Sequence, residues 1–194
     1  FAFDRAVIKV SVLRMVSIVI KMAKCFFQPR CKTVSANNPL LQAYDLPPFS
    51  AIRAEHVKPA IDQILADNRA AIAAILAEQG AQPDWAGLVL ALDEVNDRLG
   101  AAWSPVSHLN AVRNNPELRA VYEACLPKLS EYWTEMGQNR ALFQAYEALA
   151  ASPEAANFDV AQKTILEHAL RDFRLSGIDL PPEQQKRYGE IQMR

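Results

Sequence analysis

From about residue 54 to the end of the chain, apolar residues recur at spacings of three and four. This spacing places them on one face of a helix, and no stretch shows the alternation of apolar and polar residues that marks a half-buried strand. The sequence therefore predicts an all-α fold, built as an antiparallel array of helices. The helices are expected at 54–80, 84–100, 105–137 (a short one, then a long one), 142–149, 159–176 and from 180–183 onward.

Two helix-start signals bracket the most apolar stretch, at Ser104-Pro105 and at Asn115-Pro116. Each offers a side-chain oxygen for the N-cap and a proline for the first helical position, where the missing N–H has no bond to lose. We therefore expect a short helix to begin at Ser104 and a long one at Asn115. Pro127 lies inside the long helix and is expected to kink it.

Single residues predict further helix ends and surface contacts. Gly80 is expected to end the first helix, and Gly177 is expected to end the helix at 159–176 as a C-cap in the left-handed conformation. Asp84 is expected to cap the second helix. On the outer face of that helix, Glu94 and Arg98 have the spacing of an i,i+4 ion pair.

The helix that begins near residue 116 carries one long apolar face, which includes Cys125. No base lies near Cys125 in the sequence, so it is interpreted as a small core residue in a reducing compartment, with a reactive thiol as the alternative. Aromatic residues on the helical faces are interpreted as core too, with an aromatic ligand-binding box as the alternative. They are Trp85, Trp103, Tyr122, Tyr132 and Trp133.

Residues 34–52 form a proline-rich segment ahead of the first helix, with Pro39, Pro47 and Pro48. Proline restricts the residue before it to extended conformations. We therefore expect an extended arm that lies across the helices. Its contacts are expected to be Leu40, Leu41, Tyr44 and Phe49.

Charge is distributed unevenly. Residues 1–33 carry seven basic residues and one acidic residue, whereas residues 34–194 carry 14 basic and 21 acidic ones. An acidic body lacks the clustered positive charge that a nucleic acid requires, so no nucleic-acid partner is predicted.

Three hypotheses compete for the basic segment 1–33. A membrane span is disfavoured because Lys9, Arg14 and Lys21 interrupt the apolar run before it reaches about 18 residues. A targeting peptide would fit the basic composition, but no small-residue cleavage site follows. The favoured hypothesis is that the segment is not part of the native protein and that Val34 marks a start codon read as valine.

Several segments resemble one family of enzymes. They are WSPVSHLNAV at 103–112, NPELRAVYEACLPKLSEY at 115–132, NPLLQAYDLPPFSAIRAEHVKPAI at 38–61, ALDEVNDRLG at 91–100 and ALRDFRLSGIDLPPEQQKRYGEI at 169–191. Residues 34–194 as a whole resemble the amino-terminal region of oligopeptidase A-type zinc metallopeptidases of the thimet oligopeptidase family. The resemblance implies that 53–194 is a helical amino-terminal domain of a larger helical peptidase. The last helix has no capping signal, so truncation at 194 is expected.

What the resemblance implies for function is hydrolysis of short peptides in the cytoplasm by a zinc-dependent metalloendopeptidase. In that family the zinc ligands and the catalytic glutamate belong to HExxH and a later helix. The chain contains no HExxH, so we predict no catalytic or metal-ligating residue here and no zinc bound by this chain.

The missing carboxy-terminal catalytic domain is the expected partner of this portion. We expect this portion to supply part of the channel wall, to restrict substrate size and to be inactive alone. Its substrate-binding residues are not predicted. A stand-alone helical interaction module without activity is the alternative.

Three histidines are assigned local roles. His56 is interpreted as a surface or capping residue, and His108 as a structural hydrogen-bonding residue with contact to substrate as the alternative. His168 and Asp172 have i,i+4 spacing, which two metal ligands would share. Two ligands alone make a weak metal site, so a surface ion pair beside Glu167 and Arg171 is preferred.

Overall fold

The computed structural model describes residues 38–80 and 82–192, which belong to one compact unit. These residues form six α-helices and three short helical turns, and none of them lies in a strand. The all-α prediction is thus confirmed. The hypotheses on residues 1–33 fall outside the described residues, and the domain limits at 33 and 52 stay predictions.

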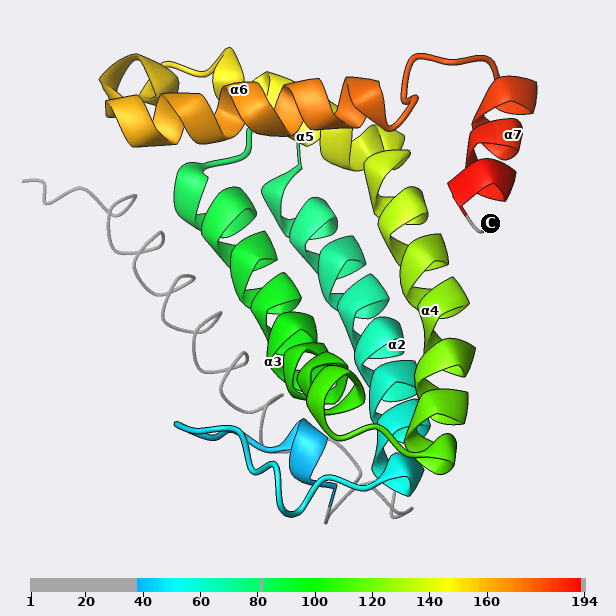
Figure 1. The fold of residues 1–194 in the computed structure, drawn as a ribbon. Helices are drawn as coiled ribbons and strands as arrows, with labels where there is room; N and C mark the ends of the chain where they lie inside the picture. Colours follow the sequence, from blue (N-terminus) through cyan, green and yellow to red (C-terminus); the bar gives the residue numbers. More distant parts are fainter. Residues whose placement is uncertain (1–37, 81, 193–194) are drawn as a thin grey trace, which may run out of the picture. The chain divides into compact units, whose positions relative to one another are not determined.

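Three long helices, α2 (Ala54–Gln79), α3 (Ala91–Val112) and α4 (Pro116–Gly137), lie side by side, and two further helices pack across one end of them (Figure 1). Helix α3 runs antiparallel to α2, as predicted, whereas α4 runs parallel to α2 (Figure 1), so the prediction of an antiparallel array holds for only one of these two pairs. The central helix, α2, contacts both neighbours, α3 and α4, and also α5 (Arg140–Ala150), while α7 (Pro182–Gln192) packs on α4. The elements are η2 (Pro39–Leu41), α2 (Ala54–Gln79), η3 (Trp85–Leu90), α3 (Ala91–Val112), α4 (Pro116–Gly137), α5 (Arg140–Ala150), η4 (Glu154–Asn157), α6 (Val160–Leu175) and α7 (Pro182–Gln192).

The core forms where the apolar faces of these helices meet. Helix α2 contributes Val57, Ala60, Ile61 and Ile64, all with no exposed surface, at the three- and four-residue spacing seen in the sequence. Helices α3, α4 and α5 add further buried residues, the turn η3 adds Leu88, and the arm adds Leu40. One continuous core therefore joins α2 to its neighbours and to the arm.

Most predicted helix ends are confirmed. The side chain of Asn115 accepts a hydrogen bond from the Leu118 amide at 2.7 Å, and that of Asp84 accepts from the Gly87 amide at 2.7 Å. Gly177 follows α6 with a φ of 83°, in the left-handed region that favours glycine. Helix α4 continues through Pro127, and the kink there stays a prediction.

The expected break within 100–105 is wrong, because α3 runs unbroken through Gly100 and Pro105. A proline inside a helix leaves the carbonyl four residues earlier without its amide donor, which here is the carbonyl of Ala101. The hydroxyl of Tyr44, from the arm, donates a hydrogen bond to that carbonyl. A residue distant in sequence thus replaces the bond that Pro105 removes, and the Ser104-Pro105 signal is overridden.

Replacing Tyr44 with phenylalanine is expected to lower the free energy of unfolding by about 1 kcal/mol, a typical net value for one hydrogen bond. In a Pro105→Ala background the new amide can donate to Ala101, so the same replacement should then have less than about half that effect. Urea unfolding of the four proteins in the cycle measures both values. Equal losses in the two backgrounds would contradict this role of Tyr44.

Ion pairs on the surface of α2 reach both neighbouring helices. Asp67 pairs with Arg98 of α3 at 3.1 Å, so the predicted pair of Arg98 with Glu94 is wrong. Arg98 can pair with a residue of another helix because α2 and α3 run side by side, which brings the carboxylate of Asp67 within its reach. Towards α4, Arg69 pairs with Glu135 at 2.7 Å, and Asp62 pairs with Lys128.

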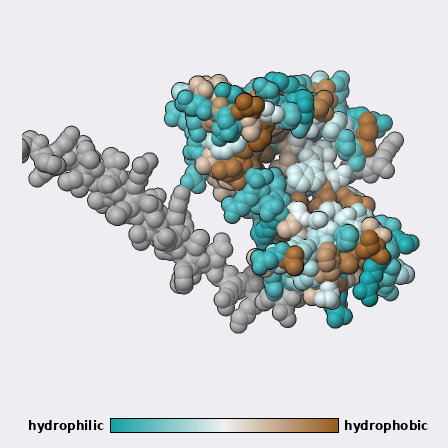
Figure 2. All heavy atoms as spheres, turned by 60° about the vertical axis from the view of Figure 1, so that its left-hand side comes forward, coloured by the Kyte–Doolittle hydropathy of each residue, from teal (hydrophilic) through white to brown (hydrophobic). Residues whose placement is uncertain are grey.

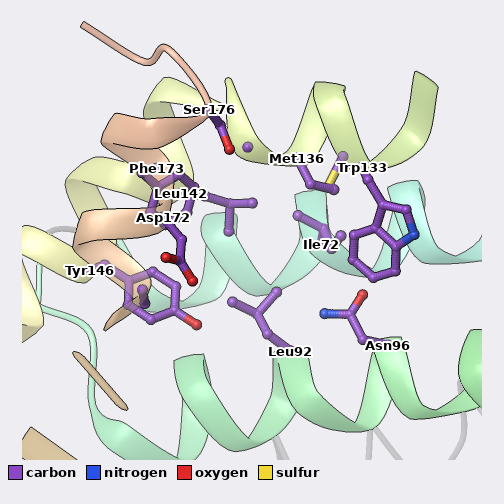
Figure 3. A pocket seen from close by; sticks show the side chains of 12 residues that line it. Ile72, Leu92, Asn96, Trp133, Met136, Leu142, Tyr146, Asp172, Phe173 and Ser176 are labelled. Atoms are coloured by element: carbon purple, nitrogen blue, oxygen red, sulfur yellow. The ribbon is translucent and has the colours of Figure 1, made fainter. Parts of the chain in front are cut away.

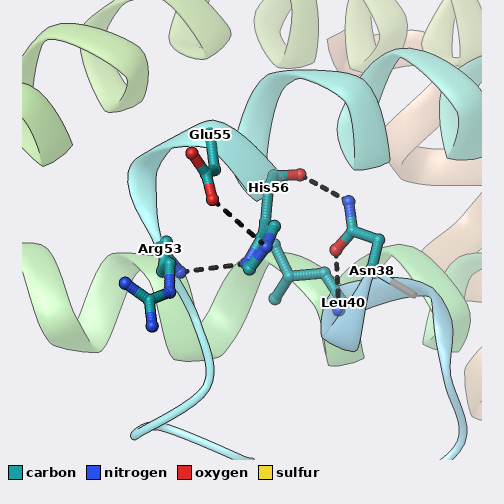
Figure 4. A network of polar contacts seen from close by, with 5 residues as sticks. All are labelled: Asn38, Leu40, Arg53, Glu55 and His56. Atoms are coloured by element: carbon teal, nitrogen blue, oxygen red, sulfur yellow. Dashed lines mark hydrogen bonds and ion pairs between the residues drawn. The ribbon is translucent and has the colours of Figure 1, made fainter. Parts of the chain in front are cut away.

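The arm is attached to α2 by a small polar network (Figure 4). The side chain of Asn38, only 5% exposed, donates a hydrogen bond to the His56 carbonyl at 2.8 Å and accepts one from the Leu40 amide at 3.0 Å. Leu40 itself is buried. The amide of Arg53 donates to Nδ1 of His56 at 3.1 Å, which confirms the capping interpretation of His56. Phe49, expected to lie across the helices, is 40% exposed.

Several apolar residues expected to face inward are exposed. Ile191 of α7 is 55% exposed and Ile165 of α6 is 47% exposed, while Tyr188 is half-buried. Helix α7 makes its main helix contacts with α4, and α6 with α5, so the outer faces of α6 and α7 stay uncovered. In Figure 2, apolar side chains form separate patches among polar ones on the surface.

Candidate functional site

A cleft of about 490 Å³ opens where α5 and α6 cross the ends of the three long helices. Its volume lies within the range of small-molecule sites, roughly 300–1,000 Å³. Apolar side chains dominate the wall, and a few polar groups face the interior (Figure 3). The lining residues are Ile72, Leu92, Asn96, Trp133, Met136, Gly137, Leu142, Tyr146, Ala169, Asp172, Phe173 and Ser176.

Trp133 forms one end of the cleft. It follows buried Tyr132 on α4 and lies beside the row of buried residues of that helix. The sequence predicted a core position for Trp133, but its side chain is 50% exposed. Its ring packs edge-on against Tyr132, with centroids 5.1 Å apart. Because the indole is half-exposed and lines the cleft, Trp133 offers an aromatic surface to it.

A buried polar network supports this end. The hydroxyl of Tyr132 donates a hydrogen bond to Oδ1 of Asn96 at 3.3 Å, and Nδ2 of Asn68 donates to the same hydroxyl at 3.4 Å. Tyr132 is fully buried and Asn68 is 2% exposed. Burial raises the pKa of Tyr132, although the hydrogen bond from Asn68 lowers it. The network therefore holds Asn96 in place, with its amide at the edge of the cleft (Figure 3).

Tyr146 of α5 stands at the opposite end, against Phe173 of α6 at a ring-centroid distance of 5.6 Å. Burial, and secondarily the negative charge of Asp93, raises the pKa of Tyr146 to about 12. Its hydroxyl is therefore neutral at physiological pH, able to donate and to accept hydrogen bonds.

Asp172 of α6 brings a carboxylate to the cleft, and in Figure 3 it points towards Leu92. Its Oδ1 accepts hydrogen bonds from Nε and Nη2 of Arg171 at 3.2 and 3.1 Å. Asp172 therefore pairs with its neighbour Arg171, and the predicted surface ion pair of His168 with Asp172 does not form among the described residues. The carboxylate stays near the solvent, because its side chain is 62% exposed.

The three histidines do not converge. His56, His108 and His168 come from α2, α3 and α6, and within residues 38–80 and 82–192 no group of three His, Cys, Asp or Glu side chains could hold a metal ion. His108 contacts the ring of Phe49, with centroids 5.4 Å apart, so an aromatic contact replaces the hydrogen bonds predicted for it.

Cys125 is fully buried in the core, as the sequence predicted. Burial raises the pKa of its thiol, and the charge of Asp62 raises it further. A thiol with a raised pKa holds less of the thiolate that attacks electrophiles, so this environment favours an inert side chain.

Comparison with known families identifies the family of this chain. The family described as "Neurolysin/Thimet oligopeptidase, N-terminal domain" matches residues 61–185, which include α3, α4, α5 and α6 in full. The chain belongs to the neurolysin/thimet oligopeptidase family. The resemblance stated from the sequence segments is thereby confirmed.

Relatives of this oligopeptidase-family chain match it over most of its length. Oligopeptidase A of Haemophilus influenzae is 51% identical over 160 residues, which are 81% of this chain and 23% of the relative. Oligopeptidase A of Escherichia coli is 52% identical over 157 residues, with the same two shares. "Probable cytosolic oligopeptidase A" of Arabidopsis thaliana is 32% identical over 157 residues, covering 81% of this chain and 22% of the relative. The chain thus spans about a quarter of the length of these relatives.

The cleft of this oligopeptidase-family chain was missed by sequence reasoning. Its polar groups Asn96, Tyr146 and Asp172 come from three different helices, and no motif links them. The available signal was Trp133, which follows Tyr132 directly and so cannot share its direction on a helix. A second structural finding is that no helix in the described part of the chain is long and apolar enough to cross a membrane.

Proposed function

We propose that the chain is the amino-terminal helical portion of an oligopeptidase A-like zinc metalloendopeptidase that hydrolyses short peptides in the cytoplasm. The observation that carries the proposal is the 51% identity to Oligopeptidase A of Haemophilus influenzae over 160 residues. Identity at this level over 81% of the chain supports the same role in the same kind of enzyme.

In this proposal the helical layers supply part of the wall of a substrate channel. The array of α2, α3 and α4, capped by α5 and α6, packs around one continuous core, and such a packed layer suits a channel wall. A rigid wall restricts entry to short or unfolded peptides, because a folded protein cannot pass a narrow opening without unfolding. Peptides are thus the proposed substrates, and the remainder of the enzyme the proposed partner.

Zinc does not fit the residues described here, because His56, His108 and His168 lie on separate helices and no three-ligand group forms among the described residues. A catalytic zinc site takes three protein ligands. The zinc of the proposed enzyme would therefore be held by the catalytic portion, which the family places in the rest of the polypeptide, and no catalytic step is assigned to the residues described here.

An activity assay tests the proposal. The 194-residue chain and the longest polypeptide encoded in frame by the source gene are purified and incubated with an internally quenched peptide, with and without a chelator. We expect chelator-sensitive cleavage by the longer polypeptide and none above background by the 194-residue chain. Chelator-sensitive cleavage by the 194-residue chain, or an inactive longer polypeptide that contains HExxH, would contradict the proposal.

A stand-alone interaction module is the second candidate. It is favoured by exposed apolar residues on the last two helices, among them Val160 (83%), Leu175 (69%) and Ile191 (55%). Such residues mark contact surfaces when they gather in a patch. The mass of the native product separates the two candidates, because a module would be made without a catalytic portion.

A further inference from the structure

The cleft between α5, α6 and the three long helices is lined by a single charged side chain, which is negative. Asp172 is the single residue with a formal charge among the twelve that line it, and no lysine, arginine or histidine is among them. Arg171 contacts Oδ1 of Asp172, whereas Oδ2 has no hydrogen-bond partner within residues 38–80 and 82–192. One carboxylate oxygen is therefore available to a positively charged group in the cleft.

Aromatic rings flank the same space from three helices. Trp133 comes from α4, Tyr146 from α5 and Phe173 from α6, and all three line the cleft. The faces of aromatic rings attract cations, by about 0.5–2 kcal/mol depending on solvent exposure. Between the rings, buried Leu92 and Leu142 offer an apolar floor.

We propose that this cleft binds a primary ammonium group carried on an apolar stem, as in an aryl-alkyl amine or the lysine side chain of a peptide. The ammonium donates a hydrogen bond to Oδ2 of Asp172, and the stem lies on Leu92 and Leu142. The neutral hydroxyl of Tyr146, which lies at the same end of the cleft as Asp172 (Figure 3), accepts a further ammonium proton or binds water that does so. This site stands apart from the proposed peptidase activity, because binding needs no catalysis.

Arg171 does not block the site. Its side chain is 57% exposed and its pairing with Asp172 is between adjacent residues on the surface of α6. Exposed pairs of this kind contribute about 0–1 kcal/mol. The guanidinium can therefore keep Oδ1 while an ammonium occupies Oδ2, or turn into the solvent with little loss.

Phenethylamine and the neutral 2-phenylethanol are the test probes, because they share the aromatic stem and differ in the charged group. Both are titrated into the 194-residue chain and followed by NMR and by tryptophan fluorescence. We expect saturable binding of phenethylamine about fivefold tighter than that of 2-phenylethanol, as for one partly exposed charge pair. Equal affinities, or no saturable binding of either probe, would overturn the proposal.

Variants locate the site. In Asp172→Asn the preference for the amine is expected to disappear, whereas in Asp179→Asn it should stay, although Asp179 is an exposed acid with an arginine partner as well. Trp133→Leu should weaken both probes about equally. A preference that survives Asp172→Asn, or is lost in Asp179→Asn, would place the amine elsewhere and overturn the assignment, as would unchanged binding in Trp133→Leu.

A second pair of ligands separates free amines from peptides. A blocked tripeptide with a central lysine is compared with the same peptide carrying norleucine, at equal ionic strength. A preference for lysine that depends on Asp172 identifies a peptide side chain as an acceptable source of the ammonium. If phenethylamine binds and the lysine peptide does not, the site takes free amines, and the ammonium proposal stands in that form.

Discussion

Tyr132→Ala is expected to lower the free energy of unfolding by about 3–5 kcal/mol, the range for removing a large aromatic side chain from a core. Tyr132 has no exposed surface, and its ring packs against Trp133. The replacement leaves a cavity among α2, α3 and α4 and removes a hydroxyl that two asparagines use. Thermal or urea unfolding followed by circular dichroism measures the loss.

Tyr132→Phe separates packing from hydrogen bonding. It keeps the ring but leaves Oδ1 of Asn96 and Nδ2 of Asn68 without their shared partner, so a loss of about 1–3 kcal/mol is expected. Tyr122→Phe is the matched control, because Tyr122 is only half-buried and stacks on Trp103 through its ring. Its effect should stay within about 0.5 kcal/mol. A Tyr132→Phe variant as stable as the control would show that the polar network contributes nothing.

Asn38→Ala is expected to lower the free energy of unfolding by about 2 kcal/mol, because the amide of Leu40 and the carbonyl of His56 lose a buried partner. Asn38 also caps η2, so the replacement loosens the arm from α2 as well. Hydrogen exchange should rise first at residues 38–44, which directly reports release of the arm.

The control for Asn38 is Asn114→Ala. Asn114 is exposed, and its side chain donates only to Asn110, one turn earlier. A surface replacement of this kind stays within about 0.5 kcal/mol. Comparable losses in both variants would mean that the buried hydrogen bonds of Asn38 contribute no more to the free energy of unfolding than exposed ones do.

Local signals in the sequence predicted the helices well. Asn115, Asp84 and Gly177 act within three residues of the backbone they cap, so the sequence around them contains the whole interaction. The interior of α3 shows the limit. Ser104-Pro105 has the form of a helix start, but the hydroxyl that allows the helix to continue belongs to Tyr44, 57 residues from Ala101 in sequence.

The cleft was beyond prediction for a related reason. Its walls come from five helices, and its shape depends on how α5 and α6 cross the others, which periodicity does not specify. Periodicity placed Trp133 and Tyr132 on one stripe, but adjacent positions on a helix point about 100° apart, so only one of them can face the core. The histidines divide in the same way. His56 has its predicted local role, bonded by the amide of Arg53, whereas His108 contacts Phe49, which is distant in sequence.

The ion pairs from α2 to α4 have a consequence for alternative packings of these helices. Asp62 with Lys128 and Arg69 with Glu135 join residues separated by the same 66 positions. Exposed pairs add little stability. A slip of α4 by one turn along α2 would nevertheless separate both pairs at once, while many apolar contacts could re-form. The two ion pairs thus act chiefly by favouring the native register of α4 along α2 over registers that are shifted by one turn.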